Sequence, residues 1–232
     1  PVGRLATGVF VEEAPMVFAQ GVLTETRNRT DFAIVSNIQV PGVPFDASGK
    51  YVTPDGETVH QPQAMFAVRL PDGTERYTRN GKFTVDAAGQ LVTPEGYLVL
   101  DALRRPIRLE YGENDLAVTP QGGLVDGATG NPLLDADGLP LSMLVVRIEN
   151  PHRLIREGSG VFRLPEGDGL PPAVAPEDGV EVYQGFVESS NVDAAQATVD
   201  LMAAARAYEA NQRIVQYLDK ILEKTVNEVG RV

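Results

Sequence analysis

The stretch "VESSNVDAAQATVDLMAAARAYEANQRIVQYLDKILEKTVNEVGRV", residues 187–232, decides the fold because it differs from everything before it. It contains no Pro, and its only Gly is Gly230. Ala, the strongest helix former, is abundant in its first half. Ser190 can cap a helix, with Asp193 completing a capping box in which Glu is more usual. The sequence therefore predicts one helix over residues 192–229, about 55 Å long at ~1.5 Å per residue.

Apolar residues recur along this helix with the seven-residue spacing of helices that pack against other helices. With Leu201 at an a position, the a series comprises Ala194, Leu201, Tyr208, Val215, Leu222 and Val229, and the d series comprises Ala197, Ala204, Asn211, Leu218 and Thr225. Ile214, Ile221 and Val226 widen the stripe in the second half. The pattern favours a coiled-coil-forming helix. An alternative is a helix that folds back on the domain before it.

The residues before the helix predict an all-β domain. Gly and Pro recur every few residues, and one pattern returns three times, as "VTPDG" at 52–56, "VTPEG" at 92–96 and "VTPQG" at 118–122. In each copy Pro suits the second position of a turn and Gly suits a later position with positive φ. Short alternating or β-branched runs flank such turns, which is typical of many short strands. The fold class is thus mainly β with one long C-terminal α-helix.

Composition suggests four segments along the chain. Residues 1–34 form an extended segment and the first strands, and residues 65–186 form the core of the β domain. Between them, residues 35–64 are rich in Pro and Gly, with one hairpin expected around residues 54–56, and we interpret them as an insertion. Residues 187–232 form the C-terminal helix.

Bulk properties exclude several classes of protein. The chain has 232 residues, enough for one sizeable core or two modest ones, and a net charge of -12. An acidic chain has no electrostatic reason to bind nucleic acid or anionic membranes. Cysteine is absent, which excludes disulfides and thiolate chemistry. No run approaches the ~18 apolar residues of a membrane span, and no signal peptide opens the chain. Because Pro1 stands where an initiator Met would, we expect a fragment.

No motif predicts catalysis, a cofactor or a metal. The two His residues, His60 and His152, are far apart in sequence and lack spaced ligand partners. The "DADG" at residues 135–138 fails the calcium-loop pattern, because Leu133 and Leu144 occupy positions that need carboxylates, so we interpret it as an acidic turn. Nucleophile-elbow and dinucleotide-binding patterns are also absent. We therefore predict that the chain is not an enzyme.

Three blocks of sequence resemble the bacterial flagellar axial proteins, most closely the basal-body rod proteins of the FlgG/FlgF type. The first, residues 183–232, contains Gln184-Gly185, the Glu188-x-Ser190-Asn191-Val192 motif and "RAYEAN" inside the helix. The second, residues 70–100, resembles the family's core pattern with "YTR-x-G-x-F". The third and weaker block, residues 18–34, resembles its "Q-G-x-L…D-x-AI" segment. Together the blocks cover most of the chain in the expected order.

The resemblance implies a structural subunit of the flagellar rod, the shaft that transmits torque. The family passes directly from the third block into its core, so residues 35–64 again read as an insertion. The family also begins with a helical segment that this chain starts beyond, and that segment is the natural partner of the C-terminal helix. The resemblance thus implies that residues 187–232 form an axial helix of the assembly. The implied assembly interface comprises Asn191, Val192, Leu201, Tyr208, Asn211, Val215, Leu218, Leu222 and Val229.

The resemblance also implies partners and a location. The partners are copies of the chain itself, other axial rod and hook proteins, and the flagellar export apparatus, with no nucleic acid and no membrane insertion. The location is the basal body outside the cytoplasmic membrane, in the periplasm or cell-wall zone. Two other classes remain open from the residues alone. One is a secreted β-rich binding module or adhesin on a coiled-coil stalk, and the other is an envelope enzyme acting on cell-wall glycan.

Overall fold

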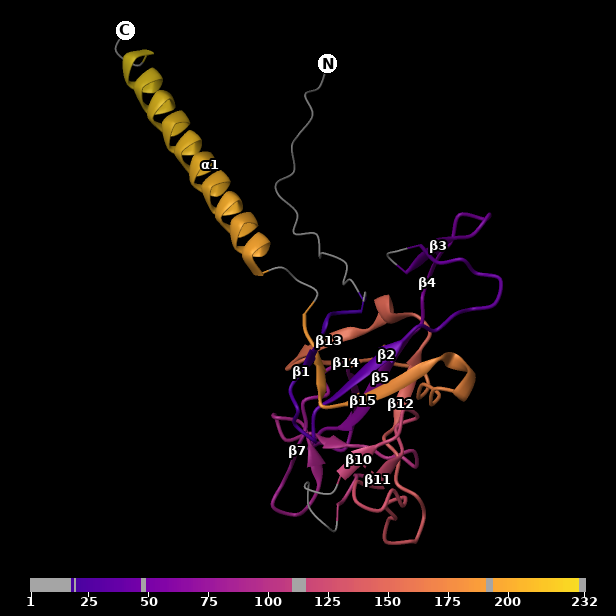
Figure 1. Cartoon of the computed structure of the whole chain (residues 1–232). Coiled ribbons are helices and arrows are strands. Elements are labelled where there is room, and N and C mark those ends of the chain that lie inside the picture. Colours follow the sequence, from indigo (N-terminus) through magenta and orange to yellow (C-terminus); the bar gives the residue numbers. More distant parts are fainter. Residues whose placement is uncertain (1–17, 19, 47–48, 110–115, 191–193, 230–232) are drawn as a thin grey trace. The chain divides into compact units, whose positions relative to one another are not determined.

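The computed structural model describes residues 18, 20–46, 49–109, 116–190 and 194–229 (Figure 1). The chain divides into two compact units, Pro1–Ser189 and Ser190–Val232. The described part of the first unit consists of strands and short 3-10 turns, and that of the second is one α-helix. The prediction of a mainly β chain with one long C-terminal helix is confirmed.

An antiparallel eight-stranded sheet forms the centre of the first unit. Its strands, in order, are β13 (Ile155–Gly158), β14 (Val161–Arg163), β6 (Glu75–Thr78), β5 (Gln63–Arg69), β9 (Leu98–Val99), β8 (Leu91–Val92) and β7 (Thr84–Val85), and β12 (Val145–Ile148) also pairs with β5. The central strand β5 is the longest, with the sequence QAMFAVR. Its five inner residues are all buried, which explains why its sequence is a continuous apolar run instead of an alternation.

Strand β5 separates two hydrophobic cores. Successive side chains of a strand point to opposite faces. Accordingly Ala64, Phe66 and Val68 contribute to the larger core, whereas Met65 and Ala67 contribute to the smaller one. In the larger core the ring of Phe66 meets that of Phe83 edge-on, with centroids 5.3 Å apart. Both faces of the central strand are therefore covered by residues of the same unit.

Four two-stranded sheets surround this centre. They are β1 (Leu23–Glu25) with β16 (Phe186–Glu188), β2 (Phe32–Ser36) with β15 (Val180–Gln184), β3 (Lys50–Val52) with β4 (Thr58–His60), and β10 (Leu116–Val118) with β11 (Leu124–Asp126). Short 3-10 turns lie at η2 (Pro151–Arg153) and η3 (Pro176–Asp178). Strands β15 and β16 are consecutive in sequence and are separated by Gly185, whose φ is +79°. Through this one residue, the chain passes from the strand that pairs with β2 to the strand that pairs with β1.

The three repeated "VTP" turns share one hairpin geometry. In each, the Thr backbone pairs with the residue four positions on, and the Thr hydroxyl accepts a hydrogen bond from that residue's N–H. The glycines of the three loops have φ values of +84° to +87°, as the turn chemistry predicts. The "DADG" loop has the same arrangement, with the Asp135 carboxylate accepting from the Leu139 N–H at 2.8 Å. Its interpretation as an acidic turn is confirmed.

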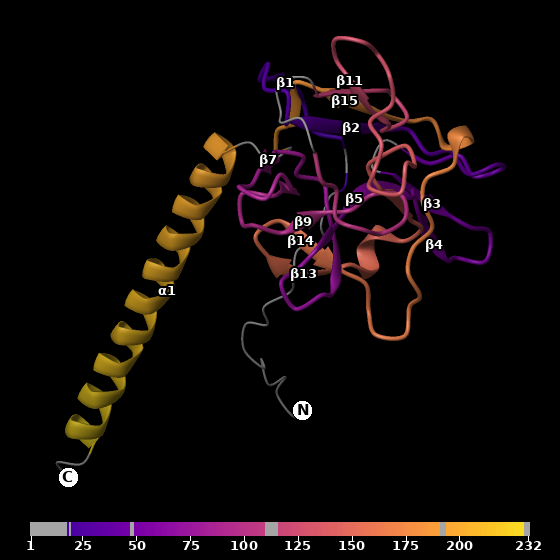
Figure 2. The same ribbon diagram turned by 90° about the horizontal axis from the view of Figure 1, so that it is seen from below.

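The segment between β2 and β5 carries the β3–β4 hairpin, which lies at the periphery of the unit in both ribbon views (Figures 1 and 2). The ends of this segment belong to the sheet and core, because β2 extends to Ser36 and Ile38 is buried in the larger core. The hairpin is therefore its peripheral part. That residues 35–64 are an insertion stays a prediction, as do the other segment boundaries.

The second unit contains helix α1 (Ala194–Val229), whose 36 residues span about 54 Å at ~1.5 Å each. The expected start at residue 192 lies outside the described residues. Among the described helices, none combines the length and apolar character needed to cross a bilayer.

Candidate assembly interface

The large apolar side chains of α1 are exposed along the helix. Leu201 is 71% exposed, Tyr208 70% and Leu222 61%. Of the other residues predicted for the interface, Asn211, Val215 and Leu218 are also exposed. Val229 lies within α1, and its side chain is not among those described. Asn191 and Val192 lie outside the described residues.

These exposed residues form one winding stripe, hereafter the seam, defined by Leu201, Tyr208, Val215, Leu218 and Leu222. In a straight α-helix, residues seven apart are turned by about 20° from one another, so a seven-residue repeat drifts slowly around the helix. A partner helix can follow such a stripe only by supercoiling with it. Contiguous exposed apolar residues of this size mark an interaction surface in a soluble protein.

Sequence reasoning assigned only the heptad positions and three flanking residues, and it missed others. Val199, Met202 and Tyr217 are also exposed apolar side chains on α1, with Tyr217 at 67%. Tyr217 precedes Ile221 by four residues and follows Ile214 by three, so the three share a neighbouring face. That spacing was the signal available in the sequence. The apolar surface of α1 is therefore wider than a two-helix seam needs.

The two His residues are far apart in sequence, and the fold brings them together. The rings of His60 in β4 and His152 in η2 have centroids 3.8 Å apart and are tilted by 34°. Burial lowers the pKa of both, Lys50 adds to the effect, and for His152 the neighbouring His60 lowers the pKa further. Among the described residues, no group of three or more His, Cys, Asp or Glu side chains could hold a metal ion. The contact between the two rings instead connects the β3–β4 hairpin to η2.

Two family models match the chain. The model described as "Flagellar basal body rod FlgEFG protein C-terminal" matches residues 183–228, which include α1 almost to its end. The model described as "Flagellar hook protein FlgE/F/G D1 domain" matches residues 61–126, which include β5 and most of the central sheet. Each unit of the structure thus contains a matched region.

Individual relatives agree with these matches. The flagellar basal-body rod protein FlgG of Borreliella burgdorferi is 30% identical over 226 residues, which are 96% of this chain and 73% of that protein. The flagellar hook-basal body complex protein FlhO of Bacillus subtilis is 29% identical over 100% of this chain and 76% of its own length. The flagellar basal-body rod protein FlgF of Rhizobium meliloti is 30% identical over 72% of this chain and 64% of its own length.

Proposed function

The chain belongs to the flagellar basal-body rod protein family, and we propose that it enters the rod by packing the seam of α1 against helices of neighbouring subunits. It is a structural subunit of the rod, located in the flagellar basal body, where it assembles with other axial flagellar proteins. The coiled-coil mode of assembly, the residues of the seam and the identity of the neighbours form the proposal.

One observation carries the proposal, which is the exposure of the seam along a 36-residue helix. Burying a Leu or Val side chain stabilises a structure by roughly 1.5–3 kcal/mol relative to leaving it exposed. The seam residues therefore supply a substantial driving force for association. Ala197 and Ala204 continue the d series at its start, and such small side chains allow close approach of a partner helix.

We further propose that the neighbours include copies of this chain. Identical subunits that contact each other head to tail, through two different surfaces, generate an open helical array when the rotation between neighbours does not close into a ring. A torque-transmitting shaft is an array of this kind. The flagellar export apparatus is proposed as the partner through which the subunit leaves the cytoplasm.

We propose no catalytic role and no cofactor, because the family is one of structural proteins. The adhesin alternative predicts a stalk that forms a defined dimer or trimer by itself. The rod proposal instead predicts that the purified chain is mostly monomeric or associates only weakly in dilute solution, because the seam is shaped for helices of neighbouring subunits in an open array and not for a closed dimer or trimer. Sedimentation equilibrium of the purified chain separates the two, and a stable trimer would favour the stalk.

The central experiment replaces Leu201→Asp and Leu222→Asp together in the protein produced in its own cells. Unpaired charges in a packed seam are strongly destabilising. Swimming should fail and rods should be absent or broken, while the subunit is still exported. In the purified chain, the thermal transition of the β domain should not change, since both residues are exposed in this structure.

The matched control is the pair Glu209→Ala and Glu223→Ala on the charged face of the same helix. It should leave swimming unchanged, because a solvated charge contributes little to packing. Normal motility of the Asp double variant would refute the seam as an assembly interface.

A further inference from the structure

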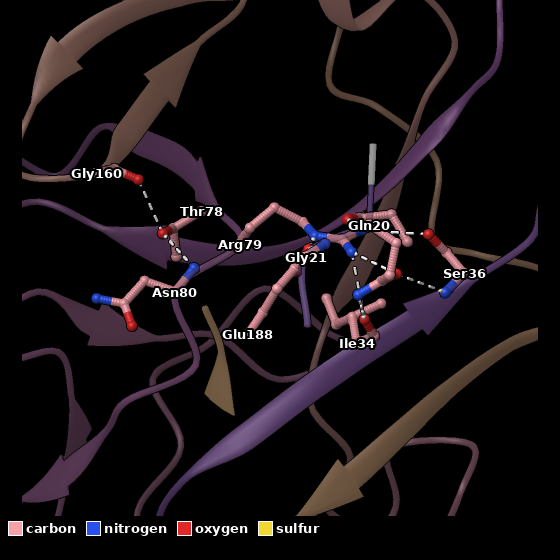
Figure 3. Close-up of polar contacts among 10 residues, drawn as sticks. Gln20, Gly21, Ile34, Ser36, Thr78, Arg79, Asn80, Gly160 and Glu188 are labelled. Atoms are coloured by element: carbon pink, nitrogen blue, oxygen red, sulfur yellow. Dashed lines mark hydrogen bonds and ion pairs between the residues drawn. The ribbon is translucent and has the colours of Figure 1, made fainter. Parts of the chain in front are cut away.

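Arg79, the residue directly after β6, donates five side-chain hydrogen bonds to four other segments of the chain (Figure 3). A guanidinium has five N–H donors in a fixed planar fork. Each has an acceptor here. Nε donates to Glu188 Oε2 at 2.9 Å, one terminal nitrogen donates to the Ala64 carbonyl and to Ser36 Oγ, and the other donates to Gln20 Oε1 and to the Ile34 carbonyl.

The carboxylate of Glu188 extends this cluster to a second chain segment. Its Oε2 accepts from Arg79, and its Oε1 accepts from the backbone N–H of Gly21 at 2.7 Å. The side chains of Arg79 and Glu188 are only 18% and 13% exposed, so water weakens the ion pair far less than it weakens a surface pair. A Cβ at position 21 would lie 2.0 Å from the Ser189 carbonyl oxygen, which explains the glycine there.

These contacts lie where the β domain joins the rest of the chain. Glu188 is the last residue of β16, and Gln20 and Gly21 precede β1. The β1–β16 sheet has only three residue pairs, and an isolated two-stranded pair of that length is marginally stable. Arg79 ties it to β2 and β5 through the Ile34 and Ala64 carbonyls. Arg79 therefore helps to hold the short pair to the centre of the domain, together with Gln20, whose Nε2 donates to the Ile34 carbonyl oxygen at 3.1 Å.

The cluster also brings together the three sequence blocks that identify the family. Gln20-Gly21 comes from the block at residues 18–34, and Arg79 comes from the "YTR" of the block at residues 70–100. Glu188 comes from the motif before the helix, in the block at residues 183–232. Arg79 and Glu188 are 109 residues apart in sequence. The three motifs have no contact that sequence alone predicts, and the fold makes them one polar cluster.

We propose that Arg79 is a positioning residue that locks the β1–β16 pair onto the central sheet against load carried by α1. The polypeptide that follows Glu188 continues directly into α1, so tension or twist on the helix reaches the domain first at β16. Without the Arg79 contacts that load would fall on the three residue pairs of β1 and β16 and on the few hydrogen bonds beside them, which would open more readily. The inference rests on the proposed role of α1 as the assembled, loaded segment.

An arginine suits this role and a lysine does not. An ammonium group offers three donors from a single nitrogen, and it cannot reach five acceptors spread around a plane. Arg79→Lys should keep the positive charge beside Glu188 and lose the contacts to β2 and β5. The two variants Arg79→Lys and Glu188→Gln therefore remove different parts of the same cluster.

Amide hydrogen exchange in the full chain tests the proposal. The Ser189 N–H donates to the Val22 carbonyl at 2.9 Å, and the Thr26 N–H donates to the Gly185 carbonyl at 2.7 Å, so these two amides flank the β1–β16 pair. Glu188→Gln should raise their opening equilibrium about tenfold or more, the loss expected for a hydrogen bond to a charged group. Arg79→Lys should do the same. The double variant should add little, because coupled residues are not additive.

The matched control is Glu157→Gln. Glu157 pairs with Arg76 in β6 and Arg163 in β14, and it touches neither β1 nor β16. It should leave exchange at Ser189 and Thr26 unchanged. Unchanged exchange there in both cluster variants would overturn the proposal, as would an equal rise at every amide of the domain. If Glu188→Gln does not fold, Arg79→Lys alone decides the outcome.

A second readout concerns load in cells. Cells carrying Glu188→Gln should assemble rods and swim in dilute medium, but they should stop in viscous medium at which Glu157→Gln cells still swim. Exchange in the isolated chain needs no assembled rod. Failure of the proposed seam and failure of the proposed role of Arg79 therefore give different results. Faster exchange with normal swimming under load would show that the cluster is only a local structural contact.

Discussion

Strand β5 and helix α1 are both rich in apolar residues, yet the apolar side chains of β5 are buried and those of α1 are exposed. The five inner residues of β5 are fully buried between two cores, whereas Leu201 and Tyr208 of α1 are about 70% exposed. The partners of β5 are residues of its own unit. The exposed seam of α1 needs partners, which we propose are neighbouring subunits. Apolar sequence therefore indicates packing, and only the structure shows whether the partner is internal.

The largest expected effect comes from a substitution inside β5, whose partners are internal. Phe66→Ala removes a fully buried ring that contacts Phe83 at the centre of the larger core. The free energy of unfolding of the β domain should fall by about 3–5 kcal/mol, measured by urea denaturation. Tyr208→Ala is the control. It should change the stability of the domain by less than ~0.5 kcal/mol, because the ring is exposed in this structure.

A smaller effect should follow from removing the peripheral hairpin. Replacing residues 41–60 by a short Gly/Ser link keeps the buried Ile38 and the hydrogen bond from Gln61 Nε2 to its carbonyl oxygen. The free energy of unfolding should fall by no more than about 1–2 kcal/mol, because closure entropy depends weakly on loop length. Loss of the cooperative transition would contradict this, and would mean that the hairpin belongs to the central fold.

The contact of this hairpin with η2 should weaken in acid. The pKa values of His60 and His152 are lowered in the folded chain, so the unfolded chain binds more protons. Stability contributed by the neutral pair is present above the ordinary His pKa of ~6.5 and is lost as the pH falls below it. Exchange at the β3–β4 amides should rise below that pH, with a smaller effect on the global transition. His152→Phe should remove the share of His152 and leave that of His60, whose pKa is lowered by burial and by Lys50.

The smallest effect is expected for removal of the helix. A chain that ends at Ser189 keeps β16 and the Arg79–Glu188 pair, and its thermal transition should match that of the full chain. A chain that ends at Gly185 loses both and should melt at a lower temperature. Equal melting of the two truncated chains would show that β16 contributes nothing to the domain. A lower melting temperature for the Ser189 chain would show that α1 belongs to its core.

The sequence predicted much of this fold because its strongest signals act over short distances. The heptad stripe and the Ala content of α1 specify a helix within a few turns. The three "VTP" loops and the "DADG" loop specify hairpins within five residues, since a Thr or Asp oxygen and a Gly with positive φ suffice. The residues proposed for the seam follow from the same local repeat. Tyr217 is not part of that repeat, because it lies on a neighbouring face of the helix.

By itself, then, the sequence determined the helix, its apolar face and the hairpin turns, because each depends on residues close together in the chain. The tertiary structure alone decided that β5 divides two cores, that His60 stacks on His152, and that Arg79 reaches Glu188. These contacts join residues far apart in sequence, and no local pattern specifies a partner at that distance. They form only when burial of the central sheet brings the segments together, which is a property of the whole domain.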